Sequence, residues 1–202
     1  MAEARGPHPG SPIVSFGELA GAIRELPPSC GPVRVVAVDG PGGSGKTTFA
    51  GRLAPALGAQ VIHSDDFPVP WDKPPVAWFG QVEEQVLGPL AAGRPGGYRR
   101  YDWVRGVFTD WVDVPVAPAL ILEGVSTARH TTPAAFTVWV EAPGELRLAR
   151  ALARDGASYA AQWRDWTRAE EEWFAVDGTR ARADLVLDGA TVPGEFVRIQ
   201  PS

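Results

Sequence analysis

The chain has 202 residues and a mass of 21.5 kDa, which corresponds to a single domain at roughly 100–200 residues per domain. Hydrophobic residues make up 45% of the chain and charged residues 21%, a globular composition, and the single cysteine, Cys30, excludes an intramolecular disulfide. A net charge of −5 and a pI near 5.2 argue against a general nucleic-acid binder, whose affinity depends on a positive field.

The first third of the chain predicts a helix and two strands around a glycine-rich turn. Residues 1–12 are rich in glycine and proline, and we expect them to be disordered. Ser15 and Glu18 then have the spacing of a capping box, followed by apolar residues at helical intervals. In chain order, the expected elements are a helix from Ser15 to Pro27, a strand at 33–39, a turn at 40–45, a helix from 46 to about 57, and a strand at 60–63.

The remainder alternates short apolar runs with helical patterns. In chain order, we expect a connection rich in Pro and Trp to about 76, a helix at 78–92, an irregular segment at 93–103, a hairpin near 107–114, strands at 119–124 and 136–141, helices at about 143–154 and 158–174, and a strand at 184–188. Strands that alternate with helices indicate a parallel sheet covered on both faces, which is an α/β fold. No run reaches the roughly 18 apolar residues of a membrane span, and the N-terminus lacks a signal-peptide pattern, so a cytoplasmic protein without a membrane partner is expected.

The clearest motif is Gly-Pro-Gly-Gly-Ser-Gly-Lys-Thr at residues 40–47, which matches G-x-x-x-x-G-K-[ST] between an expected strand and an expected helix. Glycines let backbone N–H groups curl around phosphate oxygens, and the helix N-terminus adds partial positive charge. Lys46 would reach the β- and γ-phosphates, and the Thr47 hydroxyl would ligate Mg²⁺. We therefore expect ATP and Mg²⁺, and the candidate nucleotide-binding residues are Gly42, Gly43, Ser44, Gly45, Lys46, Thr47 and Thr48.

This motif is shared by motors, transporters, GTPases and kinases, so other features must discriminate among them. The sequence contains no asparagine, which excludes the catalytic loop of protein kinases and the guanine-binding Asn-Lys-x-Asp motif of small GTPases. The Leu-Ser-Gly-Gly-Gln signature of ABC proteins is also absent. A small-molecule kinase is favoured, and the rival from another class is an ATP-binding switch protein.

Two aspartates and a glutamate are expected at the carboxyl ends of strands, where open α/β sheets bind their ligands. A kinase needs a carboxylate that accepts the proton of the acceptor hydroxyl. Asp65 and Asp66 are adjacent, so their side chains point apart and only one would face the acceptor; a helix cap or turn is the alternative for the pair. Glu123 ends a very apolar strand and is a candidate ligand of magnesium.

Four segments, in this order and spacing, resemble the uridine kinase-like group of P-loop kinases. They are Val-Asp-Gly-Pro-Gly-Gly-Ser-Gly-Lys-Thr-Thr at 38–48, His-Ser-Asp-Asp-Phe at 63–67, Tyr-Asp-Trp at 101–103 and Leu-Ile-Leu-Glu-Gly at 120–124. The resemblance implies a P-loop NTPase three-layer fold with a mostly parallel five-stranded sheet and a helical lid. It also implies that Asp65 is the general base and that Glu123 is associated with magnesium.

The resemblance places Tyr101 and Trp103 beside the acceptor, and Phe67 belongs to its Asp-x-Phe/Tyr motif, so all three are candidate substrate-binding residues. Arg100 lies beside them and would bind a phosphate or carboxylate of the acceptor, or else face water. The resemblance further implies a lid at about 147–165, from which Arg150 and Arg154 reach the triphosphate. Together with Lys46 and Asp65, Arg154 completes the set of candidate catalytic residues.

Arg147, Arg150 and Arg154 share one helical face, where three like charges repel unless an anion joins them. The alternative is that they pair with the acidic run at 170–172. After Asp155 the chain lacks the arginine-rich segment of uridine kinases. We therefore expect a single kinase domain over 13–202 that phosphorylates a small-molecule hydroxyl, with a nucleoside as the first candidate and a pantothenate-like compound, a sugar or a natural product as alternatives. Homo-oligomerisation stays open.

Overall fold

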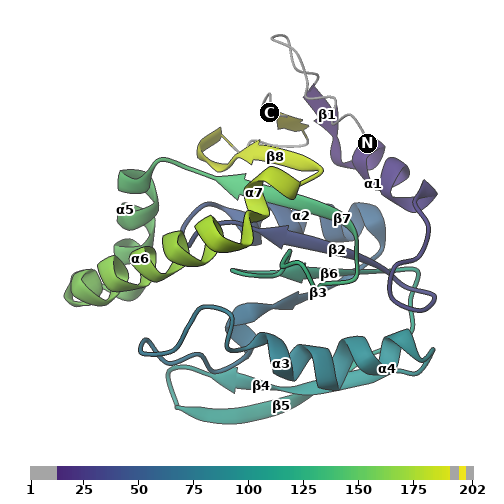
Figure 1. The fold of residues 1–202 in the computed structure, drawn as a ribbon, viewed down its shortest axis with the longest axis horizontal. Coiled ribbons are helices and arrows are strands. Elements are labelled where there is room, and N and C mark those ends of the chain that lie inside the picture. The colour runs from purple at the N-terminus through teal and green to yellow at the C-terminus, as the bar shows by residue number, and fades with distance from the viewer. Residues whose placement is uncertain (1–12, 192–195, 199–202) are drawn as a thin grey trace.

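The computed structural model describes residues 13–191 and 196–198 (Figure 1). The segment 1–12, which is predicted to be disordered, lies outside the described residues. The helices are α1 (Phe16–Glu25), α2 (Lys46–Leu57), α3 (Phe79–Val82), α4 (Gly88–Ala91), α5 (Gly144–Asp155), α6 (Ala160–Asp177) and α7 (Thr179–Arg182), with a π-helical turn η2 (Glu83–Leu87) and short 3-10 turns η1 (Ser64–Asp66), η3 (Ala157–Tyr159) and η4 (Gly189–Thr191).

Five parallel strands form the central sheet. These are β2 (Arg34–Asp39), β3 (Gln60–His63), β6 (Ala119–Glu123), β7 (Ala134–Glu141) and β8 (Leu185–Asp188). Their spatial order is β3-β6-β2-β7-β8, which can be followed from bottom to top in Figure 1. The predicted five-stranded parallel sheet is confirmed, and it places the ends of β2, β3 and β6 side by side, since Val38 and His63 both pair with Glu123.

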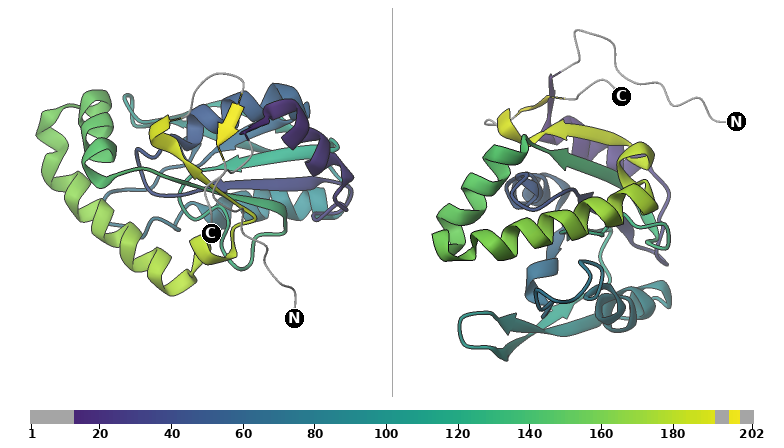
Figure 2. Two further views of the ribbon diagram at one scale, coloured as in Figure 1. Left: turned by 90° about the horizontal axis from the view of Figure 1, so that it is seen from above. Right: turned by 60° about the vertical axis from the view of Figure 1, so that its left-hand side comes forward.

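Each face of the sheet is buried by a separate hydrophobic cluster, because side chains of a strand alternate between the two faces. Val36 and Val38 of β2 pack with α1 and α2, whereas Val35 packs with α3, η2 and α4. Viewed from above, α1 and α2 lie on one side of the sheet and α6 on the other (Figure 2). The result is the predicted three-layer α/β arrangement.

The predicted irregular segment 93–103 and the hairpin near 107–114 are corrected by the structure. Residues Gly96–Asp102 form strand β4, and Val107–Val114 form the single strand β5, which pairs with β4 in an antiparallel ribbon. A Cβ atom on Gly97 would lie 2.6 Å from the Trp111 ring, and one on Gly96 would lie 2.7 Å from the backbone oxygen of Gln85. The glycines are needed for this close packing, and they also hide the alternation that marks a strand.

The helices agree with the sequence apart from their ends. Ser15 caps α1 through the predicted capping box with Glu18. The helix predicted at 78–92 runs through α3, the π-helical turn and α4, and α6 continues to Asp177, where Gly178 ends it in the left-handed conformation. The short antiparallel pair β1 (Ile13–Ser15) and β9 (Phe196–Arg198) is not predicted by the sequence. In the described part of the chain, no helix is both long and apolar enough to cross a membrane.

Candidate active site

The glycine-rich loop at residues 40–45, which we call the phosphate loop because of its sequence motif, joins β2 to α2. Residues of α5 and α6 pack closely over it. A Cβ atom on Gly43, whose φ is 75°, would lie 2.5 Å from the backbone oxygen of Arg147, and one on Gly42 would lie 2.8 Å from the Trp163 ring. No larger residue fits either position. Lys46 is the first residue of α2, is 7% exposed, and donates from Nζ to the backbone oxygen of Pro41 at 3.0 Å.

The remaining loop candidates lie in the same turn. Ser44 is fully buried, and Gly45 caps α2 in the left-handed conformation with a φ of 104°. Thr47 and Thr48 lie exposed in the first turn of α2, beside the free N–H groups of the helix N-terminus. The structure therefore brings the whole predicted loop into one cradle.

A buried carboxylate lies in this cradle. Gly42 donates its N–H to both carboxylate oxygens of Glu170 at 3.0 Å, and Trp166 donates from Nε1 to Oε1 at 2.5 Å. Glu170 is 1% exposed, and Nη1 of Arg147 lies 3.9 Å from its Oε2. Burial raises the pKa of Glu170, while the charge of Lys46 opposes the rise.

Sequence reasoning missed this role because Glu170 was grouped with Glu171 and Glu172 as one acidic run. The structure separates them, since Glu171 and Glu172 are exposed on the outer side of α6. A sequence signal did exist: Trp163, Trp166 and Glu170 recur at the spacing of one helical face. A carboxylate that shares a face with two tryptophans is placed toward the protein interior.

The three arginines of α5 have three different partners. Arg147 pairs with Glu170, so the alternative pairing with the acidic run applies to this arginine. Arg150 donates from Nη1 to the backbone oxygens of Gly43 and Gly189, at 3.2 and 3.1 Å. Arg154 makes two bonds to Asp155, at 2.7 and 3.0 Å.

The guanidinium carbon of Arg154 lies 5.6 Å from the centre of the Trp163 ring. Its charge also acts on the carboxyl groups of Asp65 and Glu123. Arg150 therefore contacts the backbone of the glycine-rich loop, and Arg154 acts electrostatically on the carboxylates at the strand ends. That these arginines reach a triphosphate stays a prediction.

The structure distinguishes the two adjacent aspartates. Asp66 is buried, accepts from the hydroxyl of Tyr98 at 2.5 Å, and forms an ion pair in which its Oδ1 lies 3.0 Å from Nε of Arg100. Asp65 is open to solvent and accepts only a long bond, 3.4 Å, from the hydroxyl of Ser64. Asp66 is thus occupied by structural contacts, whereas the charges of Glu123, Arg154, Lys46 and His63 act on the Asp65 carboxyl.

The electrostatic surroundings of Asp65 make it a stronger base than an ordinary aspartate. Protein surrounds the carboxyl on most sides although water reaches it, and this partial desolvation, together with the charge of Glu123, raises the pKa of Asp65. The charges of Arg154, Lys46 and His63 act in the opposite direction. The Asp65 carboxyl is therefore influenced by one neighbouring carboxylate and by three basic side chains.

Glu123 ends β6 beside the end of β3 and is 5% exposed. Nδ1 of His63 lies 2.7 Å from its Oε2. This bond raises the pKa of His63, against the effect of burial. The sequence predicts no role for His63, because the strand register that pairs it with Glu123 is a long-range feature.

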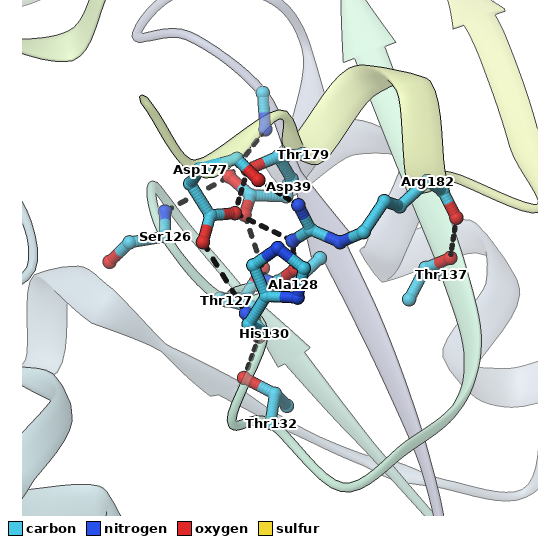
Figure 3. A network of polar contacts seen from close by, with 11 residues as sticks. Asp39, Ser126, Thr127, Ala128, His130, Thr132, Thr137, Asp177, Thr179 and Arg182 are labelled. Carbon is cyan, nitrogen blue, oxygen red and sulfur yellow. Dashed lines mark hydrogen bonds and ion pairs between the residues drawn. The ribbon is translucent and has the colours of Figure 1, made fainter. Parts of the chain in front are cut away.

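The base of the phosphate loop is fixed by a buried polar network (Figure 3). Asp39, at the end of β2, is fully buried and accepts N–H groups of Gly40, Ser126 and Ala128 at 2.7, 3.0 and 2.8 Å. Burial raises the pKa of Asp39 to about 7, although these donors favour the carboxylate. The network ties the first glycine of the loop to the chain after β6.

The predicted substrate-binding residues are divided between core and surface. Phe67 is 1% exposed and stacks on the Tyr98 ring at 4.8 Å, so its expected place beside the substrate is corrected to a place in the core. Trp103 is 49% exposed and donates from Nε1 to the backbone oxygen of Asp65 at 2.7 Å. Tyr101 packs edge-on against Trp103 with ring centres 5.2 Å apart. Arg100, paired with Asp66, lies in the same ribbon.

Comparison with known proteins gives fold similarity only. No protein-family model and no curated protein matches the chain. The structure of a possible uridine kinase from Bacillus stearothermophilus is 20% identical, covers 85% of this chain and 96% of its own, and has a TM-score of 0.61. A candidate fructose transport system kinase from Silicibacter sp. TM1040 is also 20% identical, with coverages of 86% and 98% and a TM-score of 0.65. This chain therefore has the fold of the uridine kinase-like P-loop kinases.

Proposed function

We propose that this protein is a kinase that transfers the γ-phosphate of ATP, with Mg²⁺, to a hydroxyl group of a small molecule. The observation that carries the proposal is the position of Asp65. It is a solvent-accessible carboxylate with a raised pKa, and Lys46 of the phosphate loop and Arg154 of α5 both act on it electrostatically. A switch protein that hydrolyses ATP needs a positioned water molecule. A kinase needs a base that accepts the proton of the acceptor hydroxyl, which is the role that Asp65 would have.

The chemistry assigns one role to each group. Asp65 accepts the proton of the acceptor hydroxyl while the hydroxyl oxygen attacks the γ-phosphorus and the bond to the β-phosphate oxygen breaks. Lys46 and Arg154 neutralise negative charge on the transferred group. The raised pKa of Asp65 improves its affinity for that proton. Arg150 holds the loop backbone in place through Gly43.

The residues fit a nucleotide and its metal. The loop already binds an anionic oxygen pair, since Gly42 donates to the Glu170 carboxylate. Thr47 and Glu123 supply oxygen ligands of the type that Mg²⁺ prefers, and Mg²⁺ usually completes its shell with phosphate and water. Within the described residues, no group of three or more His, Cys, Asp or Glu gathers around a metal position. Mg²⁺ would supply charge neutralisation at the phosphates.

The acceptor we favour is a nucleoside. Trp103 is half exposed and hydrogen-bonded to the backbone of Asp65, and Tyr101 lies against it. Aromatic faces of this kind stack on planar bases. One fold neighbour is described as a possible uridine kinase. A sugar is the second candidate, because the other neighbour is described as a fructose transport system kinase and matches over the same share of the chain.

The test is an ATP-consumption assay against a panel of nucleosides, sugars and pantothenate, with wild type and Asp65→Asn. We expect one acceptor class to accelerate turnover, and Asp65→Asn to lower kcat by about 10²–10⁴ with little change in ATP affinity. Asp110→Asn is the control, because Asp110 is exposed on β5 and carries the same chemical change. Slow ATP hydrolysis that no acceptor accelerates would overturn the kinase in favour of a switch protein.

A further inference from the structure

We propose that Glu170 is an internal occupant of the phosphate loop, and that a nucleotide binds only when residues 160–170 of α6 leave the loop. The inference rests on the nucleotide site of the proposed function and adds a regulatory contact to it. Glu170 competes directly with the phosphates for the same donor, so the described arrangement is a self-inhibited state.

The contacts of Glu170 are those of a bound anion. Both of its carboxylate oxygens lie 3.0 Å from the backbone nitrogen of Gly42, and Trp166 orients it through a 2.5 Å bond. Lys46 and Arg147 contribute the positive charge that an anion at this position needs. A carboxylate that is 1% exposed is stable only when donors and cations compensate its lost hydration. Here the phosphate loop provides that compensation.

Glu170 and a nucleotide phosphate exclude each other at this place. The N–H of Gly42 is a single donor that the carboxylate already uses, and a phosphate oxygen beside Glu170 would bring two negative charges together in a region of low polarity. The Trp163 ring also lies within 2.8 Å of where a Cβ atom on Gly42 would be. The carboxylate must move before a phosphate oxygen can accept from the Gly42 N–H, and the Trp163 ring, which lies on the same helix, would move with it.

The contacts of α6 determine which part of it moves. At its C-terminal end, Asp177 accepts from Arg182 and from Thr179, each at 2.6 Å, and Arg182 also donates to the backbone of Ala128 (Figure 3). These bonds anchor that end to the chain after β6. Residues 160–170 of α6 are held mainly through rings and through Glu170, and this is the part of the helix that can detach.

The ring contacts come from the connection after β3. The Trp71 ring lies 6.2, 5.4 and 5.7 Å, centre to centre, from the rings of Tyr159, Trp163 and Trp166. Trp71 is 43% exposed, so these contacts are only partly desolvated and can be broken at modest cost. These contacts join the connection after β3, which follows Asp65, to the predicted lid. If they are lost, the lid separates from this connection as well as from the phosphate loop.

The test measures binding of Mg²⁺ and AMP-PNP, a non-hydrolysable ATP analogue, by calorimetry. Glu170→Gln keeps the shape of the side chain and removes its charge, so we expect affinity to rise about tenfold, because the binding-competent fraction of the protein rises. Glu172→Gln, an exposed change of the same kind on the same helix, should leave affinity unchanged. Trp166→Phe removes the indole donor but keeps a ring, and should raise affinity by a smaller factor.

Each outcome decides between the two proposals. If the wild type binds AMP-PNP and Glu170→Gln binds it equally or more weakly, Glu170 is not an inhibitory occupant of the loop, and the nucleotide site of the proposed function is unaffected. Absence of binding by both proteins would refute the nucleotide site and this inference with it. A Glu170→Gln protein with unchanged affinity but lower kcat would place Glu170 in the chemistry instead. Thermal unfolding checks that each variant is folded, and Trp166→Phe carries the test if Glu170→Gln is not.

Discussion

Asp65 and Asp66 are adjacent carboxylates for which the structure predicts opposite consequences of the same substitution. Asp66→Asn weakens the bond from the Tyr98 hydroxyl, which is 2.5 Å long and fully buried. Burial and the neighbouring Asp66 raise the pKa of Tyr98, so this hydroxyl stays a donor. A hydrogen bond to a charged group contributes about 1.5–3 kcal/mol and a neutral one about 0.5–1.5 kcal/mol, so the exchange costs about 1–2 kcal/mol.

The second partner of Asp66 adds little. The Arg100 side chain is 52% exposed, and exposed ion pairs contribute about 0–1 kcal/mol. The free energy of unfolding of Asp66→Asn should therefore fall by about 2 kcal/mol, which lowers Tm by about 4–8 °C for a chain of this size. Turnover of the folded protein should be largely kept.

Asp65→Asn should behave in the opposite way. The Asp65 carboxyl is solvent-accessible and has only the 3.4 Å contact with Ser64, and the bond from Trp103 goes to the backbone, which the substitution keeps. The free energy of unfolding of Asp65→Asn should therefore change by less than about 0.5 kcal/mol, while kcat falls. Urea unfolding followed by circular dichroism and kcat at saturating ATP measure the two quantities. The reasoning is refuted if Asp66→Asn is as stable as wild type, or if it loses turnover while Asp65→Asn keeps it.

Three further outcomes follow from the same geometry. Lys46→Met should abolish nucleotide-dependent turnover, measured by ATP consumption, and unchanged turnover would contradict the phosphate cradle. Gly189→Ala places a Cβ atom into the backbone oxygen of Ser44 and should lower both Tm and ATP affinity. Gly51→Ala lies in the open part of α2 and should raise the free energy of unfolding by about 1 kcal/mol. Similar Tm values for the two variants would argue against this packing. Burial and Glu123 raise the pKa of Asp65 above its usual 3.8 in the free protein, and the base acts as the carboxylate. The value of kcat/KM for the acceptor, which reports groups of the free enzyme, should therefore fall with decreasing pH at a value above 3.8; an acid limb below that value would contradict the assignment.

The sheet and the phosphate loop could be predicted because their signals are local. A β-branched run, a glycine-rich turn and a helix beginning at Lys46 follow one another directly in the sequence. The ribbon β4–β5 could not, because Gly96 and Gly97 fit only once the backbone of η2 and the Trp111 ring lie over them. Local sequence patterns do not predict an element when its residue types are required by contacts with residues that are distant in the chain.

The candidate site shows the same limit. The residues alone left Asp65 and Asp66 as alternatives, and only the resemblance favoured Asp65. The contact that occupies Asp66 comes from Tyr98, which lies 32 positions away. Glu170 contacts a glycine 128 positions away, and no local pattern records that contact. Residue types and motif spacing thus indicated a class of chemistry, while the partner of each charged group required the fold.

The central position of β2 has a consequence for how the protein is made. Val38 pairs with Glu123 and Asp39 pairs with Trp139, so the strand that carries the phosphate loop has no partner until much later residues have been synthesised. Such distant pairings slow folding, because a long loop must close before they form. A nascent chain that ends before β6 contains the complete loop sequence but no sheet to hold it. The glycine-rich loop therefore becomes ordered late in synthesis, and until then the unpaired edges of β2 are exposed to aggregation.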